Sequence, residues 1–251
     1  MFYRIIHNIY MKLKEKIALA LQKELEPLGY HYFKSTGYFK KKIDKNTFVS
    51  ISYDPVCSRG EITEIYLRAE GEYRDIEKVL YKLTNSNVQR DGHLGIVCML
   101  QWLLPEDFWD VAPDFRFRND DGEETYNKKL EKLIWRTKTY LLPYLERLSN
   151  RDGALKETIA LDSKCLIFRE YIAPVMYCVW KHDKKAALDY LEARRKLLLG
   201  HVKPEEWGRL ERMKKGEFLG ALRPHHAIYY EEYVEDSKKI REWIESQEYY
   251  D

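Results

Sequence analysis

Hydrophobic residues recur with a helical spacing at the start of the chain. Between Ile9 and Leu25 an apolar residue occupies every fourth position, and lysine and glutamate fill many of the positions between. This spacing places the apolar side chains on one face of a helix, which Pro27 and Gly29 end. The pattern predicts an amphipathic helix over 9–25. The apolar residues 1–10, too few to cross a bilayer, are either a dispensable prefix or an extra turn of that helix.

After residue 29 the hydrophobic pattern has the shorter period that is typical of β-strands. Three segments rich in β-branched and aromatic residues, 30–43, 46–54 and 61–70, are separated by polar turns, and an apolar run of strand length occupies 94–104. In the third segment Ile65 and Leu67 alternate with polar residues and predict a core face. Gly37 indicates a bulge or an irregular turn, and a short helix is expected from Arg74 to Leu83. These segments predict a mainly antiparallel sheet of four strands.

After Glu123 the helical spacing returns. Residues 105–122 are expected to be a connector, with Asp121 capping a helix that runs to about Leu148 and is kinked or restarted at Pro143. The segment 150–153 is the expected domain boundary. Further helices are expected over 165–180 and over 184–200, joined at His182-Asp183 and with Gly200 as C-cap of the second, then from near 204, and over 230–247. The fold class is therefore α+β: a domain of residues 1–152, with its N-terminal helix on the sheet, and a helical subdomain of residues 153–251 packed on it.

Composition indicates the cellular compartment of the protein and limits the classes of partner to be expected. The 251 residues are 45% hydrophobic with a net charge of +2, which excludes a disordered chain and gives no global reason to expect nucleic acid or membrane. The four cysteines form no C-x-x-C pair, so they are expected to be reduced thiols of a cytoplasmic protein. No cofactor and no structural metal are expected.

One family resemblance rests on turn and core residues. Pro27-Leu28-Gly29-Tyr30, then Phe39-Lys40, and later the segments 108–115 and 141–148, resemble the bacterial proteins catalogued as domain of unknown function 4304. The resemblance covers about residues 11–161. It carries no established activity, but some neighbouring families of this kind are immunity proteins, which neutralise a toxin by binding it.

Candidate catalytic chemistry is confined to an acidic segment. The chain contains no phosphate-binding glycine loop, no G-x-S-x-G and no H-E-x-x-H, so a non-enzymatic role is favoured. The alternative is a metal-dependent hydrolase or nuclease that uses the carboxylates of the 107–124 region, since clustered carboxylates bind Mg²⁺. Such a nuclease also needs an acid-x-Lys pair, and the two candidates, Asp183-x-Lys185 and Asp236-x-Lys238, fall in expected helices. The carboxylates are Asp107, Asp110, Asp114, Asp120, Asp121, Glu123 and Glu124.

Two further segments carry candidate binding residues. His225 and His226 precede Glu231 and Glu232, but adjacent side chains point apart, so a loop before the last helix is favoured over a metal site. The hairpin 30–45 interleaves lysines with aromatic residues, as single-stranded nucleic-acid binders do. Lysines also guard strand edges and alternate aromatic residues also form cores, so nucleic-acid binding is a second alternative.

The last third of the chain separates its charges. Residues 181–216 carry eleven Lys/Arg and six Asp/Glu, whereas residues 231–251 carry three Lys/Arg and eight Asp/Glu. Such segments pair with each other or steer a partner, unless they are simply solvated helix faces. The leading hypothesis is a non-catalytic, immunity-like protein whose partner is a protein, such as a toxin. Its expected anchors are Tyr229, Tyr230, Tyr233, Trp243, Tyr249 and Tyr250.

Overall fold

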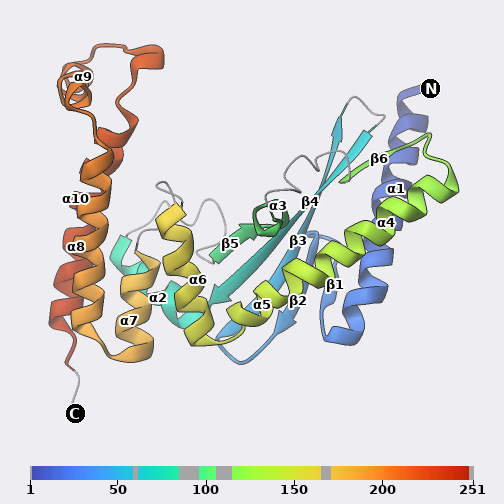
Figure 1. Cartoon of the computed structure of the whole chain (residues 1–251), viewed down its shortest axis with the longest axis horizontal. Coiled ribbons are helices and arrows are strands. Elements are labelled where there is room, and N and C mark those ends of the chain that lie inside the picture. Colours follow the sequence, from blue (N-terminus) through green and yellow to red (C-terminus); the bar gives the residue numbers. More distant parts are fainter. Residues whose placement is uncertain (1, 59–61, 85–95, 106–114, 165–170, 249–251) are drawn as a thin grey trace. The chain divides into compact units, whose positions relative to one another are not determined.

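The chain forms two compact units that are discontinuous in sequence (Figure 1). The computed structural model describes residues 2–58, 62–84, 96–105, 115–164 and 171–248. Unit 1 comprises Met1–Tyr73 and Gly95–Ala154, and unit 2 comprises Arg74–Leu94 and Leu155–Asp251. A single division at residue 152 was expected, but residues 74–94, which include the predicted short helix, group with the C-terminal unit.

Unit 1 begins with helix α1, Phe2–Leu25, so residues 2–10 extend the predicted helix. Its repeated apolar positions Ile17, Leu21 and Leu25 are buried. A 3₁₀ turn, Glu26–Leu28, follows, and Gly29 closes it in the left-handed conformation.

The sheet has six strands, not the four expected. The segment predicted as one strand is a hairpin of β1, His31–Phe33, and β2, Tyr38–Lys42. Gly37 makes the turn with a φ of 72°, and a Cβ there would lie 2.8 Å from the carbonyl oxygen of Tyr53. Glycine is therefore required for this approach, and its position divides the segment into two strands.

Strands β3, Thr47–Ser58, and β4, Ile62–Tyr73, form the long central hairpin, and the strand order is β1-β2-β3-β4-β5. Side chains alternate between two faces. On one face Ile51 lies opposite Ala69 and Tyr53 lies opposite Leu67; all four are buried. On the other face Ser52 lies opposite Arg68.

Two short strands complete the sheet along β4. Strand β5, Ile96–Met99, pairs with residues 68–71 and leads into the single helical turn α3, Leu100–Leu103. The apolar run 94–104 is thus only partly strand. Strand β6, Arg116–Arg118, pairs with residues 62–64, although its residues were expected to belong to a connector.

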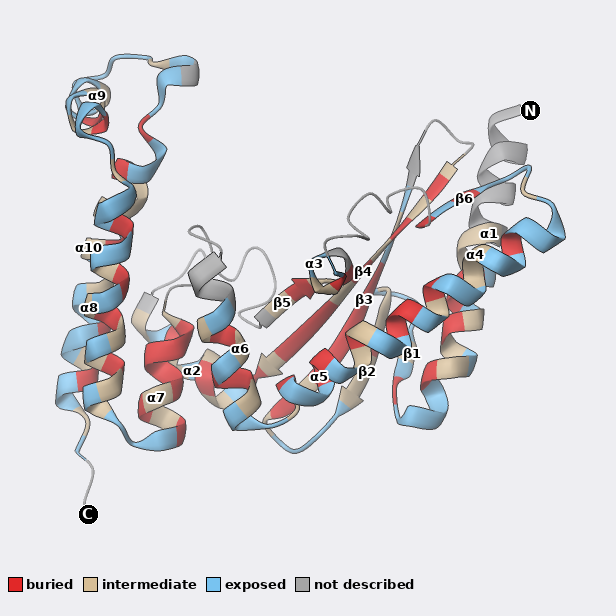
Figure 2. Ribbon diagram, in the orientation of Figure 1, coloured by how far each residue is buried: buried red, intermediate tan, exposed pale blue. Residues whose placement is uncertain are grey.

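Helices cover one face of this sheet. Helix α4, Glu123–Arg136, continues through a π-helical turn, Thr137–Leu141, into α5, Leu142–Leu148. As predicted, the helix restarts at Pro143, which lies in the first turn of α5, directly after the π-helical turn. Tyr53 donates a hydrogen bond to the carbonyl oxygen of Lys14 in α1 (2.9 Å), and Tyr73 donates one to that of Leu148 (2.7 Å). Figure 2 shows the resulting buried stretches along β3, β4 and α5.

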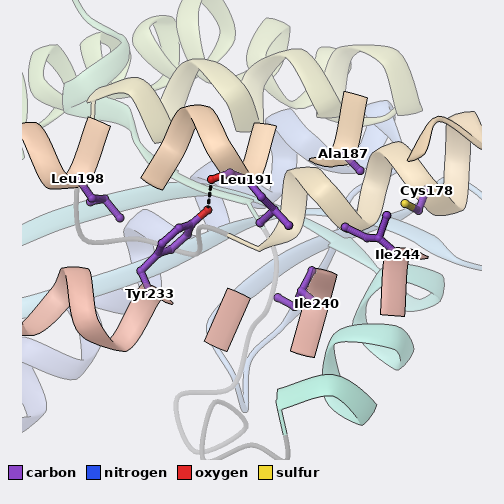
Figure 3. Packing of buried hydrophobic residues seen from close by; sticks show 7 residues of the cluster. All are labelled: Cys178, Ala187, Leu191, Leu198, Tyr233, Ile240 and Ile244. Atoms are coloured by element: carbon purple, nitrogen blue, oxygen red, sulfur yellow. Dashed lines mark hydrogen bonds between the residues drawn. The ribbon is translucent and has the colours of Figure 1, made fainter. Parts of the chain in front are cut away.

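Unit 2 is helical. Helix α2 belongs to it, and Asp75 in α2 accepts a hydrogen bond from the Trp180 indole at 3.0 Å. Its seven-residue core cluster comes from α7, α8 and α10 (Figure 3). The described helices of unit 2 are α2 (Arg74–Thr84), α6 (Arg151–Lys164, of which the first residues belong to unit 1), α7 (Ile172–Lys181), α8 (Lys184–His201), α9 (Pro204–Lys214), a 3₁₀ turn (Gly220–Leu222) and α10 (His225–Ser246).

Helix ends in unit 2 follow local chemistry. As predicted, α7 and α8 are joined at His182 and Asp183: His182 is left-handed, and Asp183 accepts a hydrogen bond from the backbone N–H of Ala186. The prediction for Gly200 was wrong. It lies inside α8, which ends at His201, before Pro204.

Candidate functional site

The six aromatic residues predicted as partner-binding anchors do not form one exposed surface. Tyr233 is 1% exposed and belongs to the core of unit 2. Its ring stacks on Tyr171, and its hydroxyl donates to the carbonyl oxygen of Leu191 at 2.8 Å (Figure 3). Tyr233 is therefore a core residue, because its one polar group is already satisfied inside the unit.

Three other members of the set are half-buried. Tyr230 lies edge-on to Trp207 and accepts a hydrogen bond from Arg195 at 3.4 Å. Trp243 packs against the core cluster, and Tyr229 lies beside the ring of His225. Tyr249 and Tyr250 lie outside the described residues. The spacing in the sequence could not separate core-facing from solvent-facing rings here, since the last helix begins at His225, five residues before the expected start.

The two histidines open helix α10 instead of lying in a loop before it. His226 lies 3.4 Å from the carboxylate of Glu206, which also accepts hydrogen bonds from the backbone N–H groups of Lys203 and His226. Burial alone would raise the pKa of Glu206, but these hydrogen bonds and the neighbouring imidazole outweigh it and lower the pKa. The described residues contain no group of three or more potential metal ligands.

The described part of the acidic segment is occupied by ion pairs. Asp120 binds Arg118 at 2.9 Å, and this guanidinium lowers the pKa of the Asp120 carboxyl. Asp121 accepts from the backbone N–H of Arg118 and pairs with Lys129 at 2.7 Å. The predicted cap is thus wrong: Gly122 is the N-cap of α4, and Asp121 fastens the strand end to the helix. Asp107, Asp110 and Asp114 lie outside the described residues, and Glu123 and Glu124 are exposed in the first turn.

Few aromatic rings of the hairpin 30–45, called the basic hairpin here, are exposed to solvent. Phe39 is fully buried and Tyr30 is nearly so, whereas Phe33 is 50% exposed. Lys34 pairs with Glu15 at 2.8 Å, and the ammonium group of Lys41 lies over the ring of Tyr30. These lysines guard and pack the hairpin, as the structural alternative to nucleic-acid binding proposes.

The second face of the sheet carries a feature that the sequence analysis missed. Register places long polar or aromatic side chains from β2, β4 and β6 on this face, around the small Ser50 and Ser52 of β3. The signal was the alternation in β3 and β4, of which only the apolar half was used. The face is formed by His31, Phe33, Tyr38, Lys40, Lys42, Phe48, Ser50, Ser52, Asp54, Val56, Ile62, Glu64, Tyr66, Arg68, Glu70, Glu72, Val97, Met99, Arg116 and Arg118, and is called the polar face below.

Side chains on the polar face bind one another across β3. Lys40 of β2 forms an ion pair with Glu72 of β4, and its ammonium group also lies over the ring of Phe48. Tyr38 donates a long hydrogen bond, 3.5 Å, to Glu70. Because serine is short, these side chains pass over β3, and Ser50 and Ser52 are buried beneath them.

The same linkage continues toward β6. Arg116 pairs with Glu64, directly opposite it, at 2.7 Å, and Tyr66 donates to the same carboxylate at 2.7 Å. Arg68 reaches Asp54 at 3.5 Å and Ser52 at 3.4 Å. The polar face thus carries guanidinium, ammonium, phenol and carboxylate groups that bind one another in several separate sets, called the cross-strand network below.

Comparison with family models, with curated proteins and with solved structures finds no match to this chain. Among the described residues, no helix is long and apolar enough to cross a membrane.

Proposed function

We propose that the protein is a non-catalytic protein-binding protein of the immunity-like, toxin-neutralising kind, and that the polar face of unit 1 is its contact surface. The observation that carries this proposal is the cross-strand network. It fixes Arg116, Arg68 and Tyr66 on a sheet face that is not used for the core of the unit. The resemblance to domain of unknown function 4304 stays a prediction beside it.

The chemistry of this face suits a protein interface. Arginine and tyrosine are the side-chain types that dominate binding energy in such interfaces, because they combine apolar area with directed hydrogen bonds. Side chains already held by a carboxylate lose less conformational entropy when a partner binds. The network therefore orders these side chains before a partner binds, which lowers the entropy cost of binding.

Both alternatives have less support in the described residues. The carboxylates Asp120 and Asp121 are engaged by Arg118 and Lys129, which disfavours a metal-dependent hydrolase or nuclease that uses them. In the hairpin Lys34 pairs with Glu15, and the rings of Phe39 and Tyr30 are buried, which disfavours nucleic-acid binding through 30–45. Tyr229, Tyr230, Trp243, Tyr249 and Tyr250 stay proposed as a second contact surface, without Tyr233.

The test is affinity capture of the tagged chain from its native cells, comparing the wild type with Tyr66→Ala/Arg116→Ala. The matched control is Tyr81→Ala/Lys185→Ala, which removes an exposed tyrosine and an exposed cation from unit 2. We expect a stoichiometric protein that is lost with the first variant and retained with the control. Equal recovery with both variants contradicts the polar face as the contact surface, and loss only with Tyr249→Ala/Tyr250→Ala moves it to the C-terminus.

A further inference from the structure

Three of the four carboxylates of the polar face lie on one strand, which also carries Arg68. The carboxylates Glu64, Glu70 and Glu72 all belong to the central strand β4. The cations that bind the first and last of them come from the strands at either side, Arg116 from β6 and Lys40 from β2. Long side chains thus lean inward from both sides over a central row of glutamates.

The two signs also lie at different depths. In the pair Arg116–Glu64 the arginine side chain is 46% exposed and the glutamate 20%; in Lys40–Glu72 the values are 30% and 22%. Glu70 is 6% exposed. Asp54, at the rim beside Arg68, is the exception, because it is more exposed than its cation. The carboxylates of β4 therefore lie beneath the cations, and a molecule approaching the face meets the cations first.

The arginines keep donors for a second acceptor. A guanidinium has five N–H groups, and Arg116 uses its Nε toward Glu64. Its two Nη groups form no hydrogen bond within the described part of the chain, and the side chain is half exposed. A second carboxylate can bind these outward donors in the planar, paired geometry that guanidinium groups favour.

We infer that the partner presents carboxylates to this face: the occupant is an acidic segment of a protein, bound on the outer side of Arg116, Arg68 and Lys40. This inference rests on the proposed protein-binding function and adds the chemical class of the partner. A nucleic acid fits less well. The buried row of glutamates nearly balances the charge of the cations, so the face exerts little long-range attraction on a phosphate backbone. A protein carboxylate needs only the short-range contact.

The experiment follows the arginine Nε–Hε signals of the full chain by NMR during titration with a short oligo-glutamate peptide. Oligo-lysine and single-stranded oligouridylate are titrated in parallel. We expect oligo-glutamate alone to shift the signals of Arg116 and Arg68, and Arg116→Glu to weaken its binding by about tenfold or more, since like charges repel. The matched control Lys215→Glu reverses an exposed cation of unit 2 and should leave the affinity unchanged.

Three outcomes overturn the inference: no shift with oligo-glutamate, shifts confined to arginines of α8 and α9, or stronger binding of oligouridylate at the same signals. Should Arg116→Glu fail to fold, Arg116→Gln removes the charge while keeping a polar side chain, and unchanged affinity with it counts equally against the inference. If capture recovers a partner that the polar-face variant loses while oligo-glutamate does not bind, the acidic partner is wrong and the proposed function stands. If neither occurs, both fail.

Discussion

The two faces of the sheet in unit 1 are built from alternate residues of the same strands, yet their chemistry differs completely. On the face opposite the polar face, called the closed face, Ile51 and Leu67 are buried in strands that α1 and α5 contact, where removal of apolar surface from water stabilises the fold. On the polar face Arg68 and Glu64 hold partners across strands, and such exposed pairs contribute little to stability. The comparison teaches that stability and recognition can be assigned to opposite faces of one sheet, so either can change with little effect on the other.

The strongest test compares two phenylalanines of the β1–β2 hairpin. Phe39 is fully buried on the closed face, and Phe33 is 50% exposed on the polar face. We expect Phe39→Ala to lower the free energy of unfolding by about 3–5 kcal/mol, through lost apolar burial and a new cavity. Phe33→Ala should lower it by less than about 1 kcal/mol. Urea unfolding followed by circular dichroism measures both, and similar losses for the two variants would contradict the division into faces.

Alkaline pH should lower the stability of the closed face through Tyr30, which is buried there. Burial, aided by the charge of Glu146, raises the pKa of Tyr30 to about 12. The folded state therefore holds this proton more tightly than the unfolded state, whose tyrosines titrate near pH 10. Stability is full below about pH 10 and falls as the pH rises toward about 12, by at most about 3 kcal/mol for this group.

The measurement is urea unfolding at a series of alkaline pH values for the wild type, for Tyr30→Phe and for Tyr81→Phe. Tyr30→Phe should flatten the loss of stability with pH, because the phenyl ring has no proton to release. Tyr81 is exposed and serves as the control. A slope that Tyr30→Phe leaves unchanged would show that other groups cause the alkaline loss.

The smallest expected difference concerns two tyrosine hydroxyls. Tyr73 donates to the Leu148 carbonyl oxygen in the core, and a Cβ at Gly71 would meet that hydroxyl at 2.6 Å, so the glycine makes room for the ring. Tyr73→Phe leaves the buried carbonyl without this donor and should cost about 1–2 kcal/mol. Tyr66→Phe, on the polar face, should cost less than about 0.5 kcal/mol, because water replaces the lost contact. Paired urea titrations compare the two, and a larger loss for Tyr66→Phe would reverse the assignment.

Much of the architecture was predictable where the sequence pattern is local. The spacing of α1, the alternation in β4 and the N-cap Asp183 each depend on neighbours in the chain, so the sequence contains the signal. Strand β6 was missed because three residues are too few to show a period, and only pairing with β4 makes them a strand. The π-helical turn before Pro143 was missed because such a turn has no simple sequence signature.

The candidate surfaces were harder to predict for a different reason. An aromatic residue has the same appearance in sequence whether it faces the core or solvent, and Tyr233 was assigned to the wrong environment on that account. The polar face needed the register of strands β2, β3, β4 and β6, which brings Lys40, Glu72 and Arg116 onto one surface from distant parts of the chain. Charge counts along the sequence pointed instead to the C-terminal third, where segments of opposite sign are contiguous.

The placement of α2 in unit 2 bears on the order in which the chain is made. Synthesis delivers Arg74–Thr84 immediately after the central hairpin, whereas α7 and α10, which pack on this helix, are made much later. During that interval its apolar side, including Ile76 and Leu80, has no partner from its own unit. A nascent chain released before residue 171 would therefore hold strands able to pair and an amphipathic helix with nothing to pack against. Premature termination should yield aggregating fragments, and productive folding of the second unit has to await the synthesis of α10.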